Sequence, residues 1–307
     1  MKGAKPERRV GIVGAGALGT LLASAFTQAG VSVRILARSP EREAAVKRVA
    51  PRAEPTDDPA ALLPASLLFF CVKSLQSKDA AGRIAPALLE SPTPLVSLQN
   101  GWGHLDLLEE ALPGTPLIAG TTTLGAYWDG AGVFHESRSG STHFAPWTRG
   151  AETQAGLAVR LFTDSNFRAE AVADAREILW KKLVLNVAVN PVTAIHDVAN
   201  GAVLDSPALY TLALAAAREA VAVGAARRFL PAPYDPEPLL RALLRDTAGN
   251  RSSMAEDLAR GRTTEADAIL GAVVREGAAA GLGTPIAASL AERLAALESA
   301  RAPRIPR

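Results

Sequence analysis

Cysteine and histidine are scarce in this sequence. Cys71 is the single cysteine, so an internal disulfide is excluded, and its setting in LLFFCVK favours a buried apolar side chain over a catalytic thiol. The four histidines show no metal-ligand spacing with one another or with the cysteine; they are His104, His135, His143 and His196. We therefore expect a reducing, cytoplasmic location and no metal site.

The chain also lacks an excess of one charge and a long apolar run. Thirty-three basic and 31 acidic residues leave a net charge of +2, and the basic ends MKGAKPERR and RAPRIPR read as solvated tails, so nucleic acid is not an expected partner. The run LYTLALAAAREAVAV is interrupted by Arg218 and Glu219, short of the roughly 20 apolar residues of a membrane span. The basic and then apolar N-terminal stretch resembles a secretory signal, but its four glycines would weaken a signal helix. We expect no membrane anchor.

The first half of the sequence does contain alternating strand and helix patterns. Near-continuous apolar runs are separated by helical patterns, and these runs are RVGIVG, VSVRIL, SLLFFCV, PLVSLQ and PLIAGTT. Such runs are typical of a parallel sheet covered on both faces, which right-handed crossovers build into a doubly wound α/β domain of Rossmann type. Further along, GAGVFHES and GSTHFAPW predict a hairpin, residues 152–162 a helix, and FRAEAV a last strand.

From about Asp174 onward the pattern is helical, rich in alanine and leucine, with no convincing strand. A chain of 307 residues is long enough for two domains of roughly 100–200 residues each. We therefore predict an N-terminal Rossmann-type domain over residues 1–172 and a C-terminal all-helical domain over residues 173–307. The alanine-rich helices of the second domain could supply a homodimer face.

A glycine motif follows the first predicted strand and opens the first helix: Gly14-Ala15-Gly16-Ala17-Leu18-Gly19. In a dinucleotide site the first glycine permits a tight turn, the second lets backbone approach a pyrophosphate, and the third allows close helix–strand packing. The N-terminus of the helix adds unpaired N–H groups and a positive dipole. The alternative is a flexible turn without a ligand.

The end of the second strand indicates which dinucleotide. An NAD site usually offers Asp or Glu there for the ribose 2′-hydroxyl, whereas this chain offers Ala37, Arg38 and Ser39, and its first carboxylate is Glu41. Arg38 could pair with a 2′-phosphate, and Ser39 could hydrogen-bond it. NADP(H) is therefore the predicted cofactor, and a solvated arginine at a strand end is the alternative.

Polar residues also follow the next two strands of the pattern. Lys73 comes after LLFFCV, and Asn100 with Gly101 comes after LVSLQ. Each taken singly is common in turns, but the carboxyl edge of such a sheet is where ligands bind. We expect Lys73 and Asn100 near the nicotinamide; Gln76 could cap the next helix or line the site.

The segment WKKLVLNVAVNPVTAI places Lys182, Asn186 and Asn190 four residues apart, on one face of an otherwise apolar helix. Burying these heads unpaired would cost several kcal/mol, roughly 2–7 for each amide, so they require partners. Pro191 should kink or end the helix near Asn190. A substrate is one candidate partner; the alternative is a lysine that reaches solvent and asparagines bonded to nearby loops.

Two further residues have structural interpretations. Ser253 with Glu256 three residues later forms a capping box, and Glu265 falls in the first turn of a helix that Thr264 could cap. Spacing alone favours these structural roles over functional ones.

Taken together, the residues resemble the ketopantoate reductase (2-dehydropantoate 2-reductase) family. The resemblance runs in order from about residue 9 to residue 285 and covers GAGALG, Arg38, CVKSLQ, SLQNG, ILWKKLVLNVAVNPVTAI, Asn200-Gly201, SSMAED and RTTEADAILG. Several ordered motifs are far more specific than any one of them. The stretch GTTTLGAYW does not match the family side chain by side chain, so the resemblance does not extend to these residues.

The resemblance implies NADPH-dependent reduction of ketopantoate to pantoate, in pantothenate and coenzyme A biosynthesis. It implies Lys182 as the catalytic general acid with Glu265 as its acidic companion, and it favours functional roles for Ser253 and Glu265 over structural ones. Substrate contacts are implied for Asn100, Asn186, Asn190, Asn200 and Ser253. Cofactor contacts are implied for Gly14 to Gly19, Arg38, Lys73, Asn100 and Glu265.

Two alternatives remain. Another NADP-dependent reductase of 2-oxo or 3-hydroxy acids could keep the lysine and change the acid, and a non-catalytic NADP(H) sensor could keep only the binding fold. A Y-x-x-x-K pair is absent around Tyr127, Tyr210 and Tyr234, which argues against short-chain dehydrogenase chemistry.

Overall fold

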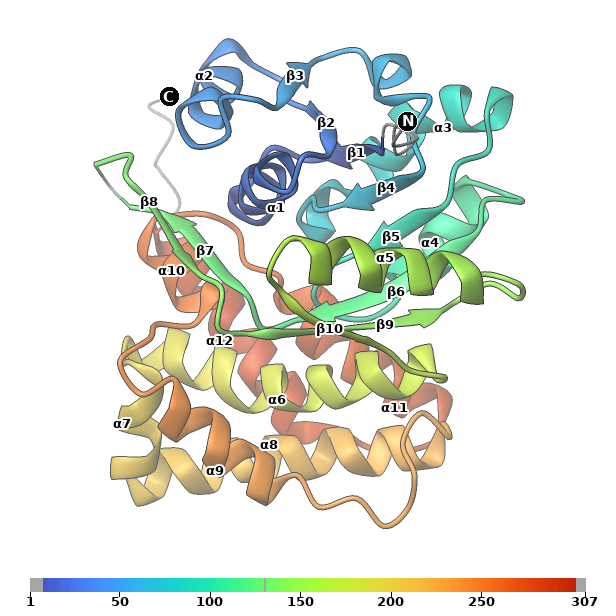
Figure 1. Cartoon of the computed structure of the whole chain (residues 1–307). Coiled ribbons are helices and arrows are strands. Elements are labelled where there is room, and N and C mark those ends of the chain that lie inside the picture. The colour runs from blue at the N-terminus through green and yellow to red at the C-terminus, as the bar shows by residue number, and fades with distance from the viewer. Residues whose placement is uncertain (1–7, 130, 302–307) are drawn as a thin grey trace, which may run out of the picture. The chain divides into compact units, whose positions relative to one another are not determined.

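The computed structural model describes residues 8–129 and 131–301 (Figure 1). Most of both basic ends, predicted to be solvated tails, lies outside these residues. The chain divides into two compact units: unit 1 comprises Met1–Gln99 and His104–Ile178, and unit 2 comprises Asn100–Gly103 and Leu179–Arg307. The predicted boundary after residue 172 concerns functional domains, which a division into compact units does not test, so it stays a prediction.

Unit 1 is built on an eight-stranded sheet of order β10-β9-β6-β5-β4-β1-β2-β3. Neighbouring strands are parallel except for the antiparallel pair β6 and β9. Ile12 of β1 aligns with Ile35 of β2 and Phe69 of β4, so the centre of the sheet is apolar. The strands are β1 (Arg9–Val13), β2 (Ser32–Leu36), β3 (Glu54–Thr56), β4 (Leu67–Phe70), β5 (Leu95–Ser97), β6 (Leu117–Thr122), β9 (Ser141–Pro146) and β10 (Arg168–Ala171).

Helices cover this sheet. Phe26 of α1, Phe69 of β4 and Phe162 of α5 form a buried aromatic cluster with ring centroids 5.3–5.8 Å apart, which fixes α1 and α5 on one face. The helices α3 and α4 pack against each other. The helical segments are α1 (Ala17–Gln28), α2 (Pro40–Val49), η1 (Pro59–Leu62), η2 (Ser74–Gln76), α3 (Ser77–Glu90), α4 (His104–Ala111) and α5 (Glu152–Asp164).

The predicted α/β fold class is confirmed, but one strand pairing was wrong. The segment GAGVFHES does not pair with GSTHFAPW; instead β8 (Phe134–Ser137) pairs with β7 (Gly125–Trp128) in a separate two-stranded sheet. The strand β9 joins the main sheet because its side chains Thr142 and Phe144 are fully buried there. The edge strand β3, only three residues long, gave no pattern that could predict it.

The regular elements of unit 2 are all helices among its described residues, as predicted, and loops connect them. Its core is one apolar cluster, to which Leu183, Val187 and Val192 contribute from α6. The segments are α6 (Ala175–His196), whose first four residues belong to unit 1, α7 (Asn200–Asp205), α8 (Pro207–Ala226), α9 (Glu237–Asp246), α10 (Ser253–Ala259), the π-helical turn η3 (Asp267–Gly271), α11 (Ala272–Ala279) and α12 (Pro285–Arg301).

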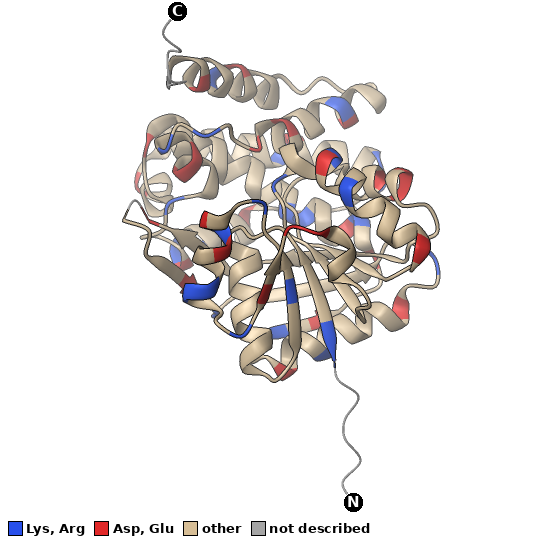
Figure 2. Ribbon diagram, turned by 90° about the horizontal axis from the view of Figure 1, so that it is seen from above, with Lys and Arg blue, Asp and Glu red and all other residues tan. Residues whose placement is uncertain are grey.

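Two helices, α6 and α8, are long and apolar enough to cross a membrane by length and composition alone. In α6, 67% of the most apolar window is buried, which is the pattern of a core helix. In the view of Figure 2, basic and acidic residues are interspersed along the ribbon, in keeping with the balanced composition. The expected absence of a membrane anchor stays a prediction.

Candidate active site

The turn after β1 requires two of its glycines for local reasons. Gly14 has a φ of +115°, and a Cβ there would lie 2.9 Å from Val72 Cγ1. A Cβ on Gly19 would lie 2.0 Å from the carbonyl oxygen of Gly14. The tight turn and the close helix–strand packing therefore depend on these two positions.

Gly16 differs from both. It has an ordinary φ of −77°, and a Cβ there would meet only the Cys71 carbonyl oxygen, at 4.0 Å. Gly16 is the N-cap of α1, no side-chain hydrogen bond caps this helix, and no acidic residue lies in its first turn. The first amides of a helix have no intrahelical acceptor. Open space over Gly16 beside these donors fits the pyrophosphate of a dinucleotide.

Arg38 follows β2 on the surface of unit 1. Its Nη1 donates to Asp79 Oδ2 on α3 at 2.8 Å, and the two side chains are 46% and 61% exposed. Ser39 caps α2, with its Oγ accepting from the Arg42 amide at 3.4 Å, and a hydrogen bond with Ser39 lowers the pKa of Glu41. The guanidinium is thus exposed at the strand end, as a phosphate ligand requires, while Ser39 serves the helix.

Between β4 and α3, Lys73 is exposed at the start of η2. Gln76 occupies the N-cap position of α3 without a side-chain capping bond. Buried Gln99 holds this loop, since its Nε2 donates to the Val72 carbonyl at 2.8 Å and to Ser77 Oγ at 2.7 Å. Cys71 is half-buried, and desolvation raises the pKa of its thiol, the opposite of an activated nucleophile.

The polar stripe of α6 lies in unit 2. Lys182 and Asn186 are half-buried, and Asn190 is 8% exposed. The helix continues past Pro191 to His196, so of the two predicted effects of Pro191 the ending of the helix near Asn190 was wrong, and the kink stays a prediction. The Nδ2 atom of Asn186 is buried with no hydrogen-bond partner among the described residues. An unpaired donor on this face fits a ligand that supplies an acceptor.

Lys182, Glu265 and Asn100 are brought together from distant parts of the sequence. Glu265 is 8% exposed, and its Oε2 accepts a hydrogen bond from Asn100 Nδ2 at 3.2 Å. Desolvation lowers the pKa of Lys182 to about 8, and the Glu265 charge raises it in part against that effect. The result is an ammonium that interacts with a carboxylate, is mostly protonated at neutral pH and loses its proton as the pH rises through about 8.

The loop before Glu265 is tied to the last helix. The Thr264 amide donates to Glu298 Oε1 of α12 at 2.8 Å, and Thr264 Oγ1 accepts from the Ala266 amide at 3.2 Å. A helix follows from Ala266, and its residues Asp267–Gly271 form the π-helical turn. Glu265 therefore precedes the helix that was predicted to contain it, and Thr264 lies one residue before the N-cap position, with its Oγ1 accepting from the first amide of the helix.

The capping box predicted for Ser253 was wrong by one residue. Ser252 is the N-cap of α10; its Oγ accepts from the Ala255 amide at 3.1 Å and from Thr193 Oγ1 of α6 at 2.8 Å. Glu256 pairs with Arg251 and Arg260 instead. Ser253 is exposed, and its hydroxyl is not needed for the cap because Ser252 already makes it.

Asn200 begins α7 and is 7% exposed. Its Nδ2 donates to Thr247 Oγ1 at 2.9 Å, and its backbone amide donates to the Asn250 carbonyl at 2.9 Å. Its Oδ1 is buried without a hydrogen-bond partner among the described residues. Asn200 thus has a structural role, with one acceptor left for a ligand.

The sequence did not predict roles for Thr193, Ser252 and Glu298. Their hydrogen bonds hold the segments that carry Asn190, Ser253 and Glu265. A serine beside Ser253 was visible, but which of two neighbouring serines caps a helix depends on where the helix begins. Among the described residues, no group of three His, Cys, Asp or Glu side chains is placed to hold a metal ion.

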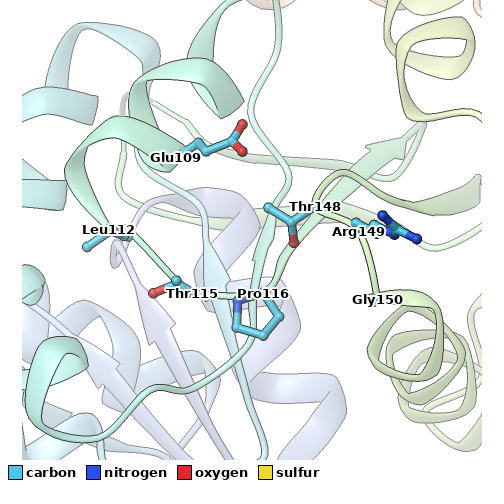
Figure 3. A pocket seen from close by; sticks show the side chains of 8 residues that line it. Glu109, Leu112, Thr115, Pro116, Thr148, Arg149 and Gly150 are labelled. Atoms are coloured by element: carbon cyan, nitrogen blue, oxygen red, sulfur yellow. The ribbon is translucent and has the colours of Figure 1, made fainter.

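A pocket lies elsewhere in unit 1 (Figure 3). It measures about 280 Å³ and adjoins the start of β6, so it is at the amino edge of the sheet, whereas Gly14 follows the carboxyl end of β1. None of the predicted site residues lines it; its lining residues are Glu109, Leu112, Gly114, Thr115, Pro116, Thr148, Arg149 and Gly150.

Comparison with known families matches both halves of the chain. The family described as "Ketopantoate reductase PanE/ApbA" matches residues 10–149, and "Ketopantoate reductase PanE/ApbA C terminal" matches residues 174–298. A 2-dehydropantoate 2-reductase of Archaeoglobus fulgidus is 32% identical over 304 residues, which is 95% of this chain and 98% of the relative. One of Escherichia coli O157:H7 is 30% identical over 95% of each chain.

Solved structures agree in fold. A PanE/ApbA family ketopantoate reductase from Ralstonia eutropha JMP134 superposes with a TM-score of 0.83 at 28% identity, over 95% of this chain and 99% of that one. A D-mandelate dehydrogenase in complex with NADH gives a TM-score of 0.85 at 23% identity, over 95% and 99%. At that identity the second likeness concerns the fold alone.

Proposed function

This chain belongs to the ketopantoate reductase family, a family of oxidoreductases, and we propose on that premise that it reduces ketopantoate to pantoate with NADPH. The product would serve pantothenate and coenzyme A biosynthesis. The observation that carries the proposal is the grouping of Lys182, Glu265 and Asn100 in unit 2, where a lysine with a depressed pKa adjoins a carboxylate. We further propose a cytoplasmic enzyme, and a homodimer formed through the alanine-rich helices.

The cofactor would be held by unit 1. The amides at the start of α1 would bind the pyrophosphate over Gly16, and Arg38 would pair with the 2′-phosphate that distinguishes NADPH from NADH. Lys73, which follows β4, would contact the nicotinamide side. When bound, NADPH supplies the hydride.

Lys182 would act as the general acid. Reduction of a 2-oxo acid builds negative charge on the carbonyl oxygen, and an ammonium at that oxygen stabilises the charge and then donates its proton. A pKa of about 8 keeps Lys182 mostly protonated at neutral pH while easing the transfer. The charge of Glu265 favours the protonated form of Lys182 and so keeps the general acid able to donate its proton.

The substrate would be held by uncharged donors and acceptors. The buried Nδ2 of Asn186 can donate to a carboxylate, and the exposed Ser253 hydroxyl can accept or donate. Asn190 would contact the substrate from the next turn of α6, and Asn200 would offer its Oδ1. Amides and a hydroxyl bind the carboxylate and hydroxyl groups of a small acid without adding charge beside Lys182.

The test is loss of NADPH absorbance with ketopantoate, then with other branched 2-oxo acids, and with NADH in place of NADPH. Rapid, NADPH-selective turnover of ketopantoate supports the proposal. Activity on another oxo acid alone would keep the mechanism and replace the substrate with that of the alternative reductase. Binding of NADPH without reduction of any acid would leave only the sensor.

A further inference from the structure

A short segment of the chain leaves unit 1 and belongs to unit 2. Asn100–Gly103 is grouped with the helical unit, although the residues before and after it lie in unit 1. The segment follows β5, and Gly101 and Gly103 have φ values of +89° and +87°. Gly101 and Gly103 flank Trp102, and their left-handed backbone conformations define the path of this segment.

Gly101 and Trp102 lie directly against the π-helical turn that follows Glu265. A Cβ on Gly101 would lie 2.4 Å from the Ala268 carbonyl oxygen and 2.7 Å from its Cβ. The Trp102 amide donates to the same carbonyl oxygen at 3.0 Å. Ala268 is three residues after Glu265, so this contact fixes the turn that begins two residues after the carboxylate-bearing residue. Single π-helical turns are rare and are frequently found at functional sites.

The indole of Trp102 packs against α6 as well. Its ring lies edge-on to Trp180, with centroids 5.0 Å apart, and 4.4 Å from the Phe229 ring. Trp180 is fully buried and precedes Lys182 by two residues on α6. The indole Nε1 donates to Glu276 Oε1 of α11 at 3.0 Å, and Glu276 Oε2 accepts from Arg227 Nε at 2.7 Å. One side chain therefore contacts the helix of the lysine and the helix that follows the glutamate.

We propose that Gly101 and Trp102 are positioning residues for the Lys182–Glu265 pair, an inference that rests on the proposed function. The backbone of these two residues holds the turn after Glu265, and the indole holds the stretch of α6 that carries Lys182. Asn100, the preceding residue, then has its amide in place to donate to Glu265. None of these contacts requires Trp102 to touch the substrate.

The charges around the pair define a readout. Glu265 is the charged group that acts on Lys182, and it favours the protonated lysine. Glu276 and Arg227, which face Trp102, are paired with each other and do not act on Lys182. Moving Glu265 away therefore lowers the pKa of Lys182, and the acid loses its proton at a lower pH. The alkaline limb of the pH profile of kcat reports this displacement.

Gly101→Ala and Gly103→Ala form a matched pair. Both place a side chain at a positive φ, but a Cβ on Gly103 meets nothing within 4 Å, whereas one on Gly101 collides with Ala268. We expect kcat of Gly101→Ala to fall about 10- to 100-fold, as for a displacement of about 1 Å at a reacting group, and its alkaline limb to move to lower pH. Gly103→Ala should stay within about threefold of wild type with the limb unmoved, because it carries only the backbone strain.

Trp102→Ala and Trp102→Phe provide a second test, which applies even if the Gly101→Ala protein does not fold. We expect the alanine variant to lower kcat and move the limb in the same direction, and the phenylalanine variant to restore most of both because it keeps the ring packing. NADPH affinity by calorimetry should be unchanged in all four. Equal kcat and an unmoved limb in folded Gly101→Ala and Trp102→Ala would overturn the inference. A wild-type protein that reduces no oxo acid would instead count against the proposed function.

Discussion

The glycine turn of unit 1 and the polar stripe of unit 2 are built in different ways. The turn uses backbone atoms of six consecutive residues, from Gly14 to Gly19, and its geometry follows from a positive φ and two close approaches. The stripe lies on one helix, α6, but it acts together with side chains that are far from it in the sequence; Asn100 and Glu265, which share a hydrogen bond, are 165 residues apart. The first kind of site is complete within one motif, and the second exists only once the helices have packed.

This difference predicts how each site fails. A substitution in the turn acts locally, on cofactor binding or on the turn itself. A substitution around the stripe acts through charge and position, and its effect appears in kcat and in the pH profile.

Lys182→Ala should have the largest effect. Removing a general acid costs about a hundred- to ten-thousand-fold in rate, so we expect kcat to fall by that amount while NADPH affinity is kept. Lys181→Ala is the matched control, because Lys181 is the neighbouring lysine on α6 and its Nζ lies 5.8 Å from the centroid of the Tyr234 ring. A Lys182→Ala enzyme with near-normal turnover would remove the lysine from the mechanism.

Glu265→Gln should lower kcat about 10- to 100-fold through the lost orientation of the acid, and it should change the pH profile. The reductive rate requires protonated Lys182, so wild-type kcat should decline as the pH rises through about 8. Without the Glu265 charge the lysine pKa falls further, and the decline should begin at lower pH. Profiles that superpose would mean that Glu265 does not act on the lysine charge.

The lysine pKa also links stability to pH. Its folded value of about 8 lies below the ordinary 10.5, so between these values the unfolded chain holds the proton more tightly than the folded one. This group therefore adds stability as the pH rises from about 8 toward 10.5 and none of that gain is present below the folded pKa. Lys182→Met should flatten this part of a chemical denaturation series against pH.

Gly14 and Gly16 separate folding from binding within the turn. Gly16→Val should fold normally, since only the Cys71 carbonyl lies within 4.0 Å of its Cβ, but it should weaken NADPH binding about tenfold or more by filling the space of the pyrophosphate. Gly14→Val should lower the melting temperature first, because its φ of +115° and the contact with Val72 oppose any side chain. Calorimetry of binding and thermal unfolding distinguish the two; the reverse order of effects would contradict the assignment.

The sequence predicted features whose causes are local. Continuous apolar runs such as LLFFCV identified the parallel strands, and the glycine spacing identified the turn after β1. The hairpin predicted between GAGVFHES and GSTHFAPW was wrong because a strand can pair with more than one partner. Burial of Phe144 favours pairing of β9 with β6 in the main sheet. The cap was wrong because Ser252 and Ser253 differ only in where α10 begins. No local pattern could have connected Glu298 with Thr264, or Trp102 with Ala268.

A smaller effect is expected for Arg38, which shares a feature with each kind of site. It follows directly after a strand, as the glycine turn does, but its partner Asp79 lies on another element. Asp79→Asn removes a negative charge beside the proposed 2′-phosphate ligand. Exposed ion pairs are worth about 0.2–1 kcal/mol, so we expect NADPH to bind about 1.5- to 5-fold more tightly.

NADH, which has no 2′-phosphate, is the control for this variant and should bind Asp79→Asn and wild type alike. Arg38→Gln should change the NADPH affinity in the opposite direction, again without affecting NADH. If Asp79→Asn weakened NADPH instead, Asp79 would hold Arg38 in the orientation that binds the phosphate. Cofactor selection would then depend, like the polar stripe, on a pair of side chains assembled by the fold and not on the strand-end motif alone.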